Sequence, residues 1–459
     1  MWNPSLLAIL PFLWSGADFL TRPPDVLRSR LARLEHAELR GETIRLELFE
    51  DEAVEAVREK LEPMGPDAFA WVGHVRDDET SSVVLSIARD VVSASVRLAS
   101  AQYRIRPDGA GLHRLEEVAP SSEPPERHPL PAGRASRPPA VIDLDEGTEL
   151  DLLVVYTPRA RRAAGGADAI ASLVGLGVAE TNLALDKSEV ETRLRLVELR
   201  EVSFAEAGRV ESDLEILKQD NDGALDEVHW LRDAYGADVV QLLVEEGDGC
   251  GIAYSMGRAG ASFSEWAFSV VERSCVDTTY AMAHELGHSL GCDHAPEDPT
   301  SKGAFSYSFG YKDLVAGFRT IMAYGPGKRV ARFSNPRVLF GGVPSGADRQ
   351  DNARSLNELR VTASRFRPSL PPPRVISLPD NARNETRFRV ASEEPRVIEW
   401  RILLGTSPGA SDVGDSGTRN EHDTFDAGIS SPETSRIYGR LWYRRGATWL
   451  HQDFRVESP

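Results

Sequence analysis

Hydrophobic and polar residues alternate along residues 40–117. The stretches "TIRLELF", "SSVVLSI" and "SASVRLASAQYRIRP" place apolar side chains at every second position, as in a strand with one buried face. The alternation ends in residues 116–140, "EEVAPSSEPPERHPLPAGRASRPPA", which are rich in proline, serine and charge. This composition is typical of an exposed linker. The pattern predicts a β-rich region followed by a segment that proteases can reach.

The pattern changes after residue 140. "LDLLVVYT" and "ADVVQLLVEE" are near-continuous apolar runs, typical of buried strands, whereas "EVETRLRLVELREVSF" alternates. "GGADAIASLVGLGVAETNLALDKS" predicts a helix, and "ALDEVHWLRDAYG" predicts a shorter one. The longer helix has apolar residues at helical spacing: Ile170, Val174, Val178 and Leu183. This order favours an α/β (α+β) domain over residues 139–370, with a central mixed sheet covered by helices.

A second proline-rich break, "RFRPSLPPPRVISLP", precedes the C-terminal part of the chain. Short alternating segments separated by Gly-, Ser- and Asp-rich turns predict a small all-β, sandwich-like module over residues 371–459. Trp400, Trp442 and Trp449 either pack in its core or form a platform for a carbohydrate or another surface.

The first residues resemble a secretory signal peptide. Leu6 to Trp14 are apolar, and Ser15 and Ala17 are small residues at the spacing of a cleavage site, which predicts a signal peptide over residues 1–17. The segment before the apolar run lacks Lys and Arg, so an ordinary apolar segment is the alternative. We expect a secreted protein. The following residues 18–138 then form a β-rich propeptide with its linker.

The charge excludes some partners. Lys and Arg number 53 and Asp and Glu number 71, so the net charge is −18. This balance argues against nucleic acid and against anionic membranes as partners of the mature form. No later apolar run is expected to cross a bilayer.

Residues 281–294, "AMAHELGHSLGCDH", contain three of the ten histidines. His284 and His288 lie four residues apart, on one face of a helix. Gly291 can end this helix in a left-handed conformation, after which the chain can bring His294 to the same ion. Three imidazoles and one open position describe a catalytic site for one Zn²⁺ ion.

Glu285 directly follows the first predicted ligand. It can accept a proton from the zinc-activated water and pass it to the leaving amine. Met282, Leu286 and Leu290 fall on another side of the helix, which they can bury. We expect Asp277 to cap the N-terminus of the helix.

The motif H-E-L-G-H-S-L-G-C-D-H resembles that of the metzincin zinc endopeptidases. The resemblance implies a methionine turn beneath the metal, and "FRTIMAYG" supplies Met322, 28 residues after His294. Tyr324 stands where some metzincins carry a tyrosine that ligates the metal or stabilises the oxyanion; a packed core tyrosine is the alternative. "DLLVVYTPRARRAAGG", "CGIAY" and "RFSNP" extend the likeness to bacterial reprolysin-like secreted peptidases, including the peptidyl-Asp metallopeptidase type. "WVGHVRDDETSSVVLSI" is similar to their propeptides.

Two features depart from the family pattern. Ala295 replaces the Asp that usually follows the third histidine, which places the rigidity of the site in doubt. The predicted propeptide has no cysteine, so it must inhibit sterically or through another ligand such as His74 or His113. Arg134 and Arg137 mark the expected activation site.

Cysteine and edge-strand assignments stay open. A Cys250–Cys275 disulfide fits an exported protein, but the sequence alone does not decide it. Cys292 is expected as a packed thiol or disulfide partner. "GIAYSM", residues 251–256, is either an ordinary strand or an edge that pairs with an extended substrate.

The sequence therefore predicts a secreted zinc endopeptidase that is made as a proenzyme and acts on proteins or peptides. The alternative is a weak or inactive peptidase scaffold used for binding or adhesion, which Ala295 favours and Glu285 opposes.

Overall fold

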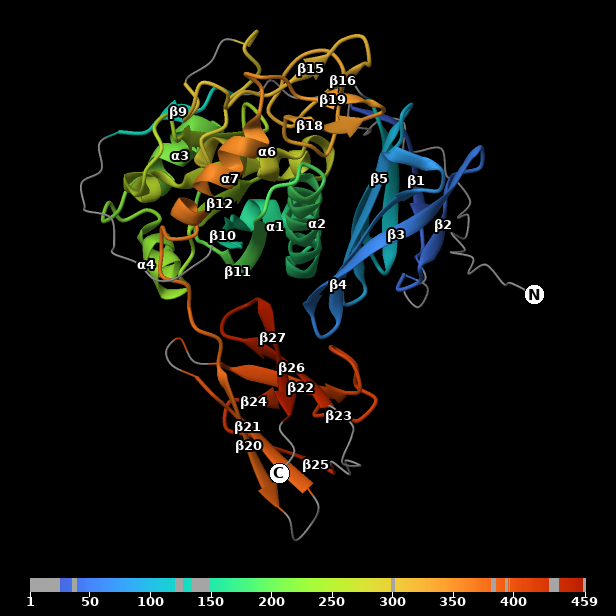
Figure 1. Ribbon diagram of the computed structural model, residues 1–459, viewed down its shortest axis with the longest axis vertical. Helices are drawn as coiled ribbons and strands as arrows, with labels where there is room; N and C mark the ends of the chain where they lie inside the picture. The colour runs from blue at the N-terminus through green and yellow to red at the C-terminus, as the bar shows by residue number, and fades with distance from the viewer. Residues whose placement is uncertain are drawn as a thin grey trace.

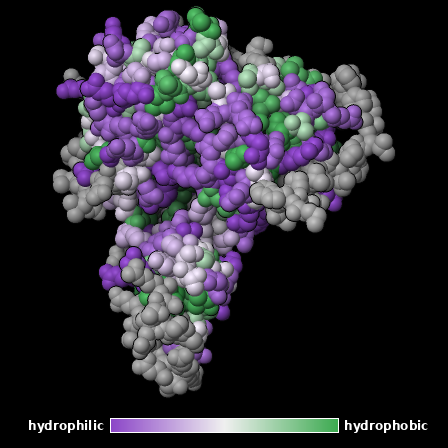
Figure 2. Space-filling view, turned by 45° about the vertical axis from the view of Figure 1, so that its right-hand side comes forward, coloured by the Kyte–Doolittle hydropathy of each residue, from purple (hydrophilic) through white to green (hydrophobic). Residues whose placement is uncertain are grey.

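The computed structural model describes residues 25–34, 39–119, 127–133, 148–298, 302–380, 385–392, 395, 397–428 and 437–456. The predicted signal peptide, Arg134 and Arg137 lie outside these residues. An N-terminal sheet and a larger mixed α/β domain lie side by side, and a C-terminal β module lies beneath them (Figure 1). Figure 2 shows this module as a narrower lobe, and hydrophilic residues over much of the visible surface of the larger bodies.

The N-terminal sheet is antiparallel and runs in the order β1-β8-β7-β6-β5-β4-β3-β2. Its strands are β1 (Val26–Ala32), β2 (Thr43–Phe49), β3 (Glu52–Gly65), β4 (Ala68–Val75), β5 (Asp78–Ala88), β6 (Val91–Arg97), β7 (Gln102–Gly109) and β8 (Leu112–Val118). Alternate residues of β4 pack in two different hydrophobic cores. Phe69 and Trp71 pack within the N-terminal sheet, whereas Ala70 and Val72 pack against α2 of the next domain.

The mixed sheet of the central domain runs in the order β11-β10-β12-β14-β13-β9. β10, β11, β12 and β14 are parallel, and β13 is antiparallel to β14. Its strands are β9 (Leu130–Pro131), β10 (Glu149–Tyr156), β11 (Arg193–Glu201), β12 (Val239–Val244), β13 (Gly251–Ser255) and β14 (Phe268–Glu272). The mixed α/β architecture predicted from the sequence is confirmed.

Helices cover this sheet (Figure 1). They are α1 (Pro158–Ala164), α2 (Ala167–Asp186), α3 (Val210–Lys218), α4 (Asp226–Ala234), α5 (Val276–Thr279), α6 (Ala281–Ser289) and α7 (Asn352–Ala363), with the short 3₁₀ helices η3 (Ala261–Trp266) and η4 (Arg273–Cys275). By length and composition α2 could cross a membrane, contrary to the expectation from the sequence. However, 89% of its apolar window is buried between the two sheets, as in the core helix of a globular domain.

Short strands follow α6. They are β15 (Lys312–Asp313), β16 (Phe318–Arg319), β17 (Lys328–Arg329), β18 (Asn335–Phe340) and β19 (Val343–Ser345). β15, β16 and β17 form one small sheet, and β18 pairs with β19. The segment between β16 and β17 contains Met322 and Tyr324, so this small sheet fixes both ends of the predicted methionine turn.

Two small sheets form the C-terminal module. One contains β20 (Arg374–Asp380), β21 (Glu385–Ala391) and β25 (Phe425–Ala427); the other contains β22 (Glu399–Gly405), β23 (Gly414–Asp415), β24 (Arg419–Asn420), β26 (Ile437–Arg444) and β27 (Trp449–Val456). Phe388 and Trp400 from the two sheets share one core. Trp400 and Trp442 are buried, so the three tryptophans do not form the exposed platform considered from the sequence.

Candidate active site

α6 carries the His-Glu motif into the core, and all nine of its residues are buried. Gly291 has a φ of +79° just beyond the helix, as predicted, and a Cβ there would lie 2.6 Å from the Cβ of Ala304. The N-terminus differs from the prediction. Asp277 lies in the separate helix α5, and Tyr280 precedes α6 in a left-handed conformation with no side-chain cap.

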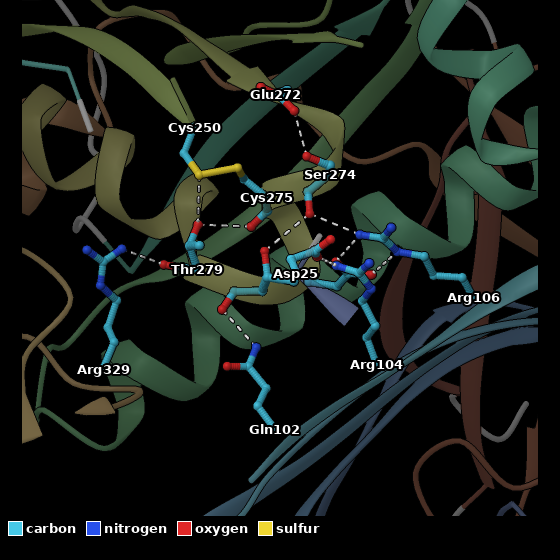
Figure 3. Close-up of a disulfide and its surroundings, with 12 residues drawn as sticks. Asp25, Gln102, Arg104, Arg106, Cys250, Glu272, Ser274, Cys275, Thr279 and Arg329 are labelled. Carbon is cyan, nitrogen blue, oxygen red and sulfur yellow. Dashed lines mark hydrogen bonds and ion pairs between the residues drawn. A yellow bond between two sulfur atoms is a disulfide. The ribbon is translucent and has the colours of Figure 1, made fainter. Parts of the chain in front are cut away.

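Asp277 instead binds the N-terminal sheet. Its carboxylate accepts hydrogen bonds from Nε and Nη2 of Arg106 in β7, at 2.6 and 2.5 Å. Arg106 also donates to the carbonyl of Ser274, and Gln102 donates to the carbonyl of Thr278. Figure 3 shows Gln102, Arg104 and Arg106 reaching toward the turn that contains Ser274. The N-terminal sheet therefore holds the segment that leads into α6.

The predicted ligands His284, His288 and His294 converge. Their Nε2 atoms lie 3.2 Å (His284–His288), 3.2 Å (His284–His294) and 3.0 Å (His288–His294) apart. Three ligand nitrogens around a tetrahedral zinc ion, each at 2.0–2.1 Å, are separated by about 3.3 Å. The cluster thus fits a single Zn²⁺ ion. Among the residues that the structure describes, these three histidines form a group that could hold a metal ion.

Backbone carbonyls orient two of these rings. Nδ1 of His284 lies 3.0 Å from the carbonyl oxygen of Ile321, and Nδ1 of His288 lies 3.1 Å from that of Cys292. A carbonyl only accepts, so each Nδ1 carries the proton and each Nε2 keeps its lone pair for a metal. Burial, reinforced by the neighbouring imidazoles, lowers the pKa of His288 and His294 well below the ordinary value. These rings are therefore held in the neutral form that binds metals.

Glu285 is buried beside the start of β13. A Cβ on Gly251 would lie 2.6 Å from its Oε1, so only glycine leaves room for the carboxylate at this position. Burial raises the pKa of Glu285 well above its usual range. A bound cation opposes this shift by favouring the carboxylate.

Met322 contacts the helix that carries the first two histidines, and Tyr324 contacts the histidines themselves. A Cβ on Gly287 of α6 would lie 2.5 Å from Sδ of Met322, so the helix packs closely on the methionine turn. The hydroxyl of Tyr324 lies 2.5 Å from Nε2 of His294 and 3.4 Å from Nε2 of His284. Tyr324 is therefore placed at the site rather than in a distant core.

Two aspartates surround the position of Ala295. Asp293 accepts a hydrogen bond from the backbone N–H of His294 at 2.8 Å. Asp298 accepts from the backbone N–H of Tyr324 at 3.2 Å and from Nζ of Lys312 at 2.6 Å. Side chains near Ala295 thus hold the backbone of the third histidine and of the methionine turn.

Residues 127–133 also lie at the site, although their sequence did not predict it. Their strand β9 pairs in parallel with Tyr254 and Ser255 at the free edge of β13, so "GIAYSM" is an edge that accepts an added strand. The carbonyl of Arg127 accepts a hydrogen bond from the hydroxyl of Tyr324 at 3.2 Å. The only available signal was the position of this segment in the predicted linker.

His74 and His113, considered as inhibitory ligands, lie elsewhere. Nδ1 of His74 lies 2.7 Å from Glu59, and Nε2 of His113 accepts from the backbone N–H of Val92 within the N-terminal sheet. Neither belongs to the histidine cluster. His128, in residues 127–133, lies close to the cluster instead, with its ring centroid 6.0 Å from that of His294.

The cysteines lie near the same helix. Cys250 and Cys275 form a disulfide that joins the start of β13 to the turn before α5 (Figure 3). Cys292 is a buried free thiol, and burial raises its pKa well above the ordinary value. It therefore behaves as a packed apolar group rather than as a metal ligand.

Comparisons with known proteins agree with this geometry. A family model described as "Metallo-peptidase family M12B Reprolysin-like" matches residues 148–348. A peptidyl-Asp metalloendopeptidase of Stenotrophomonas maltophilia (strain K279a) is 31% identical over 344 residues, which are 68% of this chain and 81% of the relative. A protein of the same name from Xanthomonas campestris pv. campestris is 33% identical over 63% of this chain and 71% of the relative.

Among solved structures, metalloproteinase-II from Bacteroides fragilis aligns with a TM-score of 0.35 and 12% identity, over 57% of this chain and 84% of that chain. The family assignment rests on the sequence relatives and on the family model. The chain belongs to the reprolysin-like metallopeptidases of family M12B and is a peptide hydrolase.

Proposed function

We propose that this chain is the precursor of a secreted zinc endopeptidase. Residues 1–17 serve as signal peptide, residues 18–138 as propeptide, residues 139–370 as catalytic domain and residues 371–459 as an accessory module. The observation that carries the proposal is the convergence of three Nε2 atoms within 3.2 Å of one another, two of them on the helix that also carries the buried Glu285.

The site residues divide the chemistry among them. When bound by the three histidines, zinc supplies a Lewis acid that makes a water acidic and polarises the scissile carbonyl. Glu285 accepts the proton of the attacking water and delivers it to the leaving amine. Tyr324 donates a hydrogen bond to the developing oxyanion. Met322 packs against α6 and supports it, and Gly291 lets the chain turn sharply after α6.

The position of residues 127–133 supports synthesis as a proenzyme. β9 occupies the edge of β13, where an extended substrate would add as a strand. The hydroxyl of Tyr324 is bonded to this segment, so it is not available to a substrate carbonyl. The N-terminal sheet and its linker therefore must leave before substrate can bind.

We further propose cleavage beside aspartate, the residue that appears in the names of the relatives. A cavity of about 500 Å³ next to the methionine turn is lined on one side by Arg319, Lys328 and Arg329, and residues 98–102 of the N-terminal region line it as well. These three cations supply the positive charge that an acidic side chain requires. Removal of the N-terminal sheet opens the cavity to substrate.

One experiment tests the proposed activity. The full chain is expressed with export, and the N-terminal residue and the zinc content of the secreted form are measured. Casein hydrolysis is followed with and without chelator. We expect a start within residues 134–147, one zinc per chain and chelator-sensitive hydrolysis. One bound zinc with no hydrolysis under any processing condition would instead favour the binding or adhesion scaffold.

A further inference from the structure

Residues 127–133 are held on both sides of His128. Before it, Nε and Nη2 of Arg127 donate to the carbonyl of Asp248 at 3.1 and 2.9 Å, and the same guanidinium pairs with the Asp248 carboxylate. After it, β9 pairs with β13, and Leu130 packs against the core of the central domain. The peptide that carries His128 is thus fixed next to the site.

The His128 ring lies close to the predicted ligands. Its centroid is 6.0 Å from that of His294, whereas the three ligand rings are 4.7 to 5.2 Å apart. His128 therefore stands just outside the cluster whose ligand atoms lie within 4.8 Å of one another. Rotation about the side-chain torsions of His128 can bring its ring as close to His294 as the ligand rings are to one another.

The chemistry of the segment also fits a ligand. Its neighbours cannot bind zinc through their side chains, because Arg127 is a cation and Pro129 and Leu130 carry no donor atom. All three cysteines of the chain lie in the central domain, so the N-terminal region has no thiolate. A fourth imidazole converts an open catalytic zinc site into a closed, four-coordinate one.

We propose that His128 is the fourth zinc ligand of the precursor. Arg127, anchored on Asp248, is the positioning residue that delivers it. Cleavage within residues 134–147 would leave His128 on the N-terminal fragment, so the ligand departs with that fragment and the fourth position opens. This inference rests on the proposed proenzyme function.

The test uses the full-length precursor with Glu285→Gln, which keeps the chain intact. We measure the number of imidazoles bound to zinc by X-ray absorption, and the visible spectrum and chelator release rate after loading with Co²⁺. We expect four imidazoles in this parent, and three in the His128→Ala variant with cobalt release faster by about tenfold or more. His74→Ala, which removes a histidine of the N-terminal sheet bonded to Glu59, is the matched control and should match the parent.

A second variant guards against misfolding. In His128→Cys a thiolate takes the fourth position, so the cobalt form should gain an intense near-ultraviolet charge-transfer band. Three imidazoles in the parent, or a cobalt spectrum that responds to Tyr324→Phe and not to either His128 variant, would overturn the inference. Failure of the parent to bind Co²⁺ or zinc would instead sink the proposed function itself.

Discussion

Replacement of Arg106 by Met should strongly destabilise the contact between the N-terminal sheet and the central domain. The substitution keeps an apolar stem but removes both hydrogen bonds to Asp277, at 2.6 and 2.5 Å. The Asp277 side chain is 0% exposed, so water cannot replace the lost hydrogen bonds. Breaking a buried ion pair on one side costs about 3–5 kcal/mol. We expect the lower end, about 3 kcal/mol, because Arg104 and Arg273 also act on Asp277.

The loss should depend on pH. Burial by itself would raise the pKa of Asp277, but Arg106 outweighs it and holds this pKa below the ordinary value. The stabilisation from the ionised Asp277 is therefore fully present above about 3.9, the pKa of aspartate in the unfolded state. It is lost as pH falls through the lower pKa of Asp277 in the folded state. Without Arg106, burial raises the pKa of Asp277, so the destabilisation that Asp277 causes in the variant is largest at neutral pH and decreases on acidification. The difference in unfolding free energy between the wild type and Arg106→Met is therefore larger at pH 7 than near pH 4.

Urea unfolding of the full chain, followed by tryptophan fluorescence between pH 4 and pH 7, measures this difference. The matched control is Arg89→Met. Arg89 pairs with Asp168 across the same interface at 3.1 Å, but the two side chains are 77% and 54% exposed. An exposed pair contributes about 0–1 kcal/mol. Equal losses of unfolding free energy in the two variants, or a loss from Arg106→Met that does not change with pH, would show that the Arg106–Asp277 ion pair does not stabilise this interface.

Three further predictions concern the site. Gly251→Ala places a Cβ 2.6 Å from Oε1 of Glu285, so kcat should fall about 10- to 100-fold at unchanged zinc content, measured by peptide hydrolysis and metal analysis. Burial lowers the pKa values of His288 and His294 in the folded protein. The metal-free protein should therefore lose stability as pH falls below about 6.5, because the histidines of the unfolded chain take up protons there. Tm measured from pH 5 to pH 8, with and without zinc, checks this. Lys328→Gln in the processed enzyme should lower kcat/KM for Asp-containing peptides about tenfold relative to their Asn counterparts; an unchanged ratio would exclude the proposed subsite.

Local patterns predicted part of the secondary structure. Alternation identified β2, β5, β6 and β7 of the N-terminal sheet, and helical spacing identified α2 and α4, because each element buries one face of its own sequence. The motif placed His284 and His288 on one helix, and Gly291 adopts the left-handed conformation that the turn requires. These features are set by residues within one or two turns of each other.

Features that depend on distant residues were not predictable in this way. Asp277 looks like a helix cap, but its partner Arg106 lies 171 residues away in another sheet. His128 sits in a linker without periodicity, and its place depends on the contact of Arg127 with Asp248, 121 residues further on. No local pattern encodes such pairings, because they arise only when separate domains pack together.

The proposed function requires Glu285 to act as the base of a zinc peptidase whose metal is held by three histidines. The most direct measurement is kcat/KM of the processed Glu285→Gln enzyme against the wild type, at equal zinc content and on one peptide. We expect a loss of about 100-fold or more, with zinc still bound. Hydrolysis of the peptide at the wild-type rate by the Glu285→Gln enzyme would show that Glu285 is not the base.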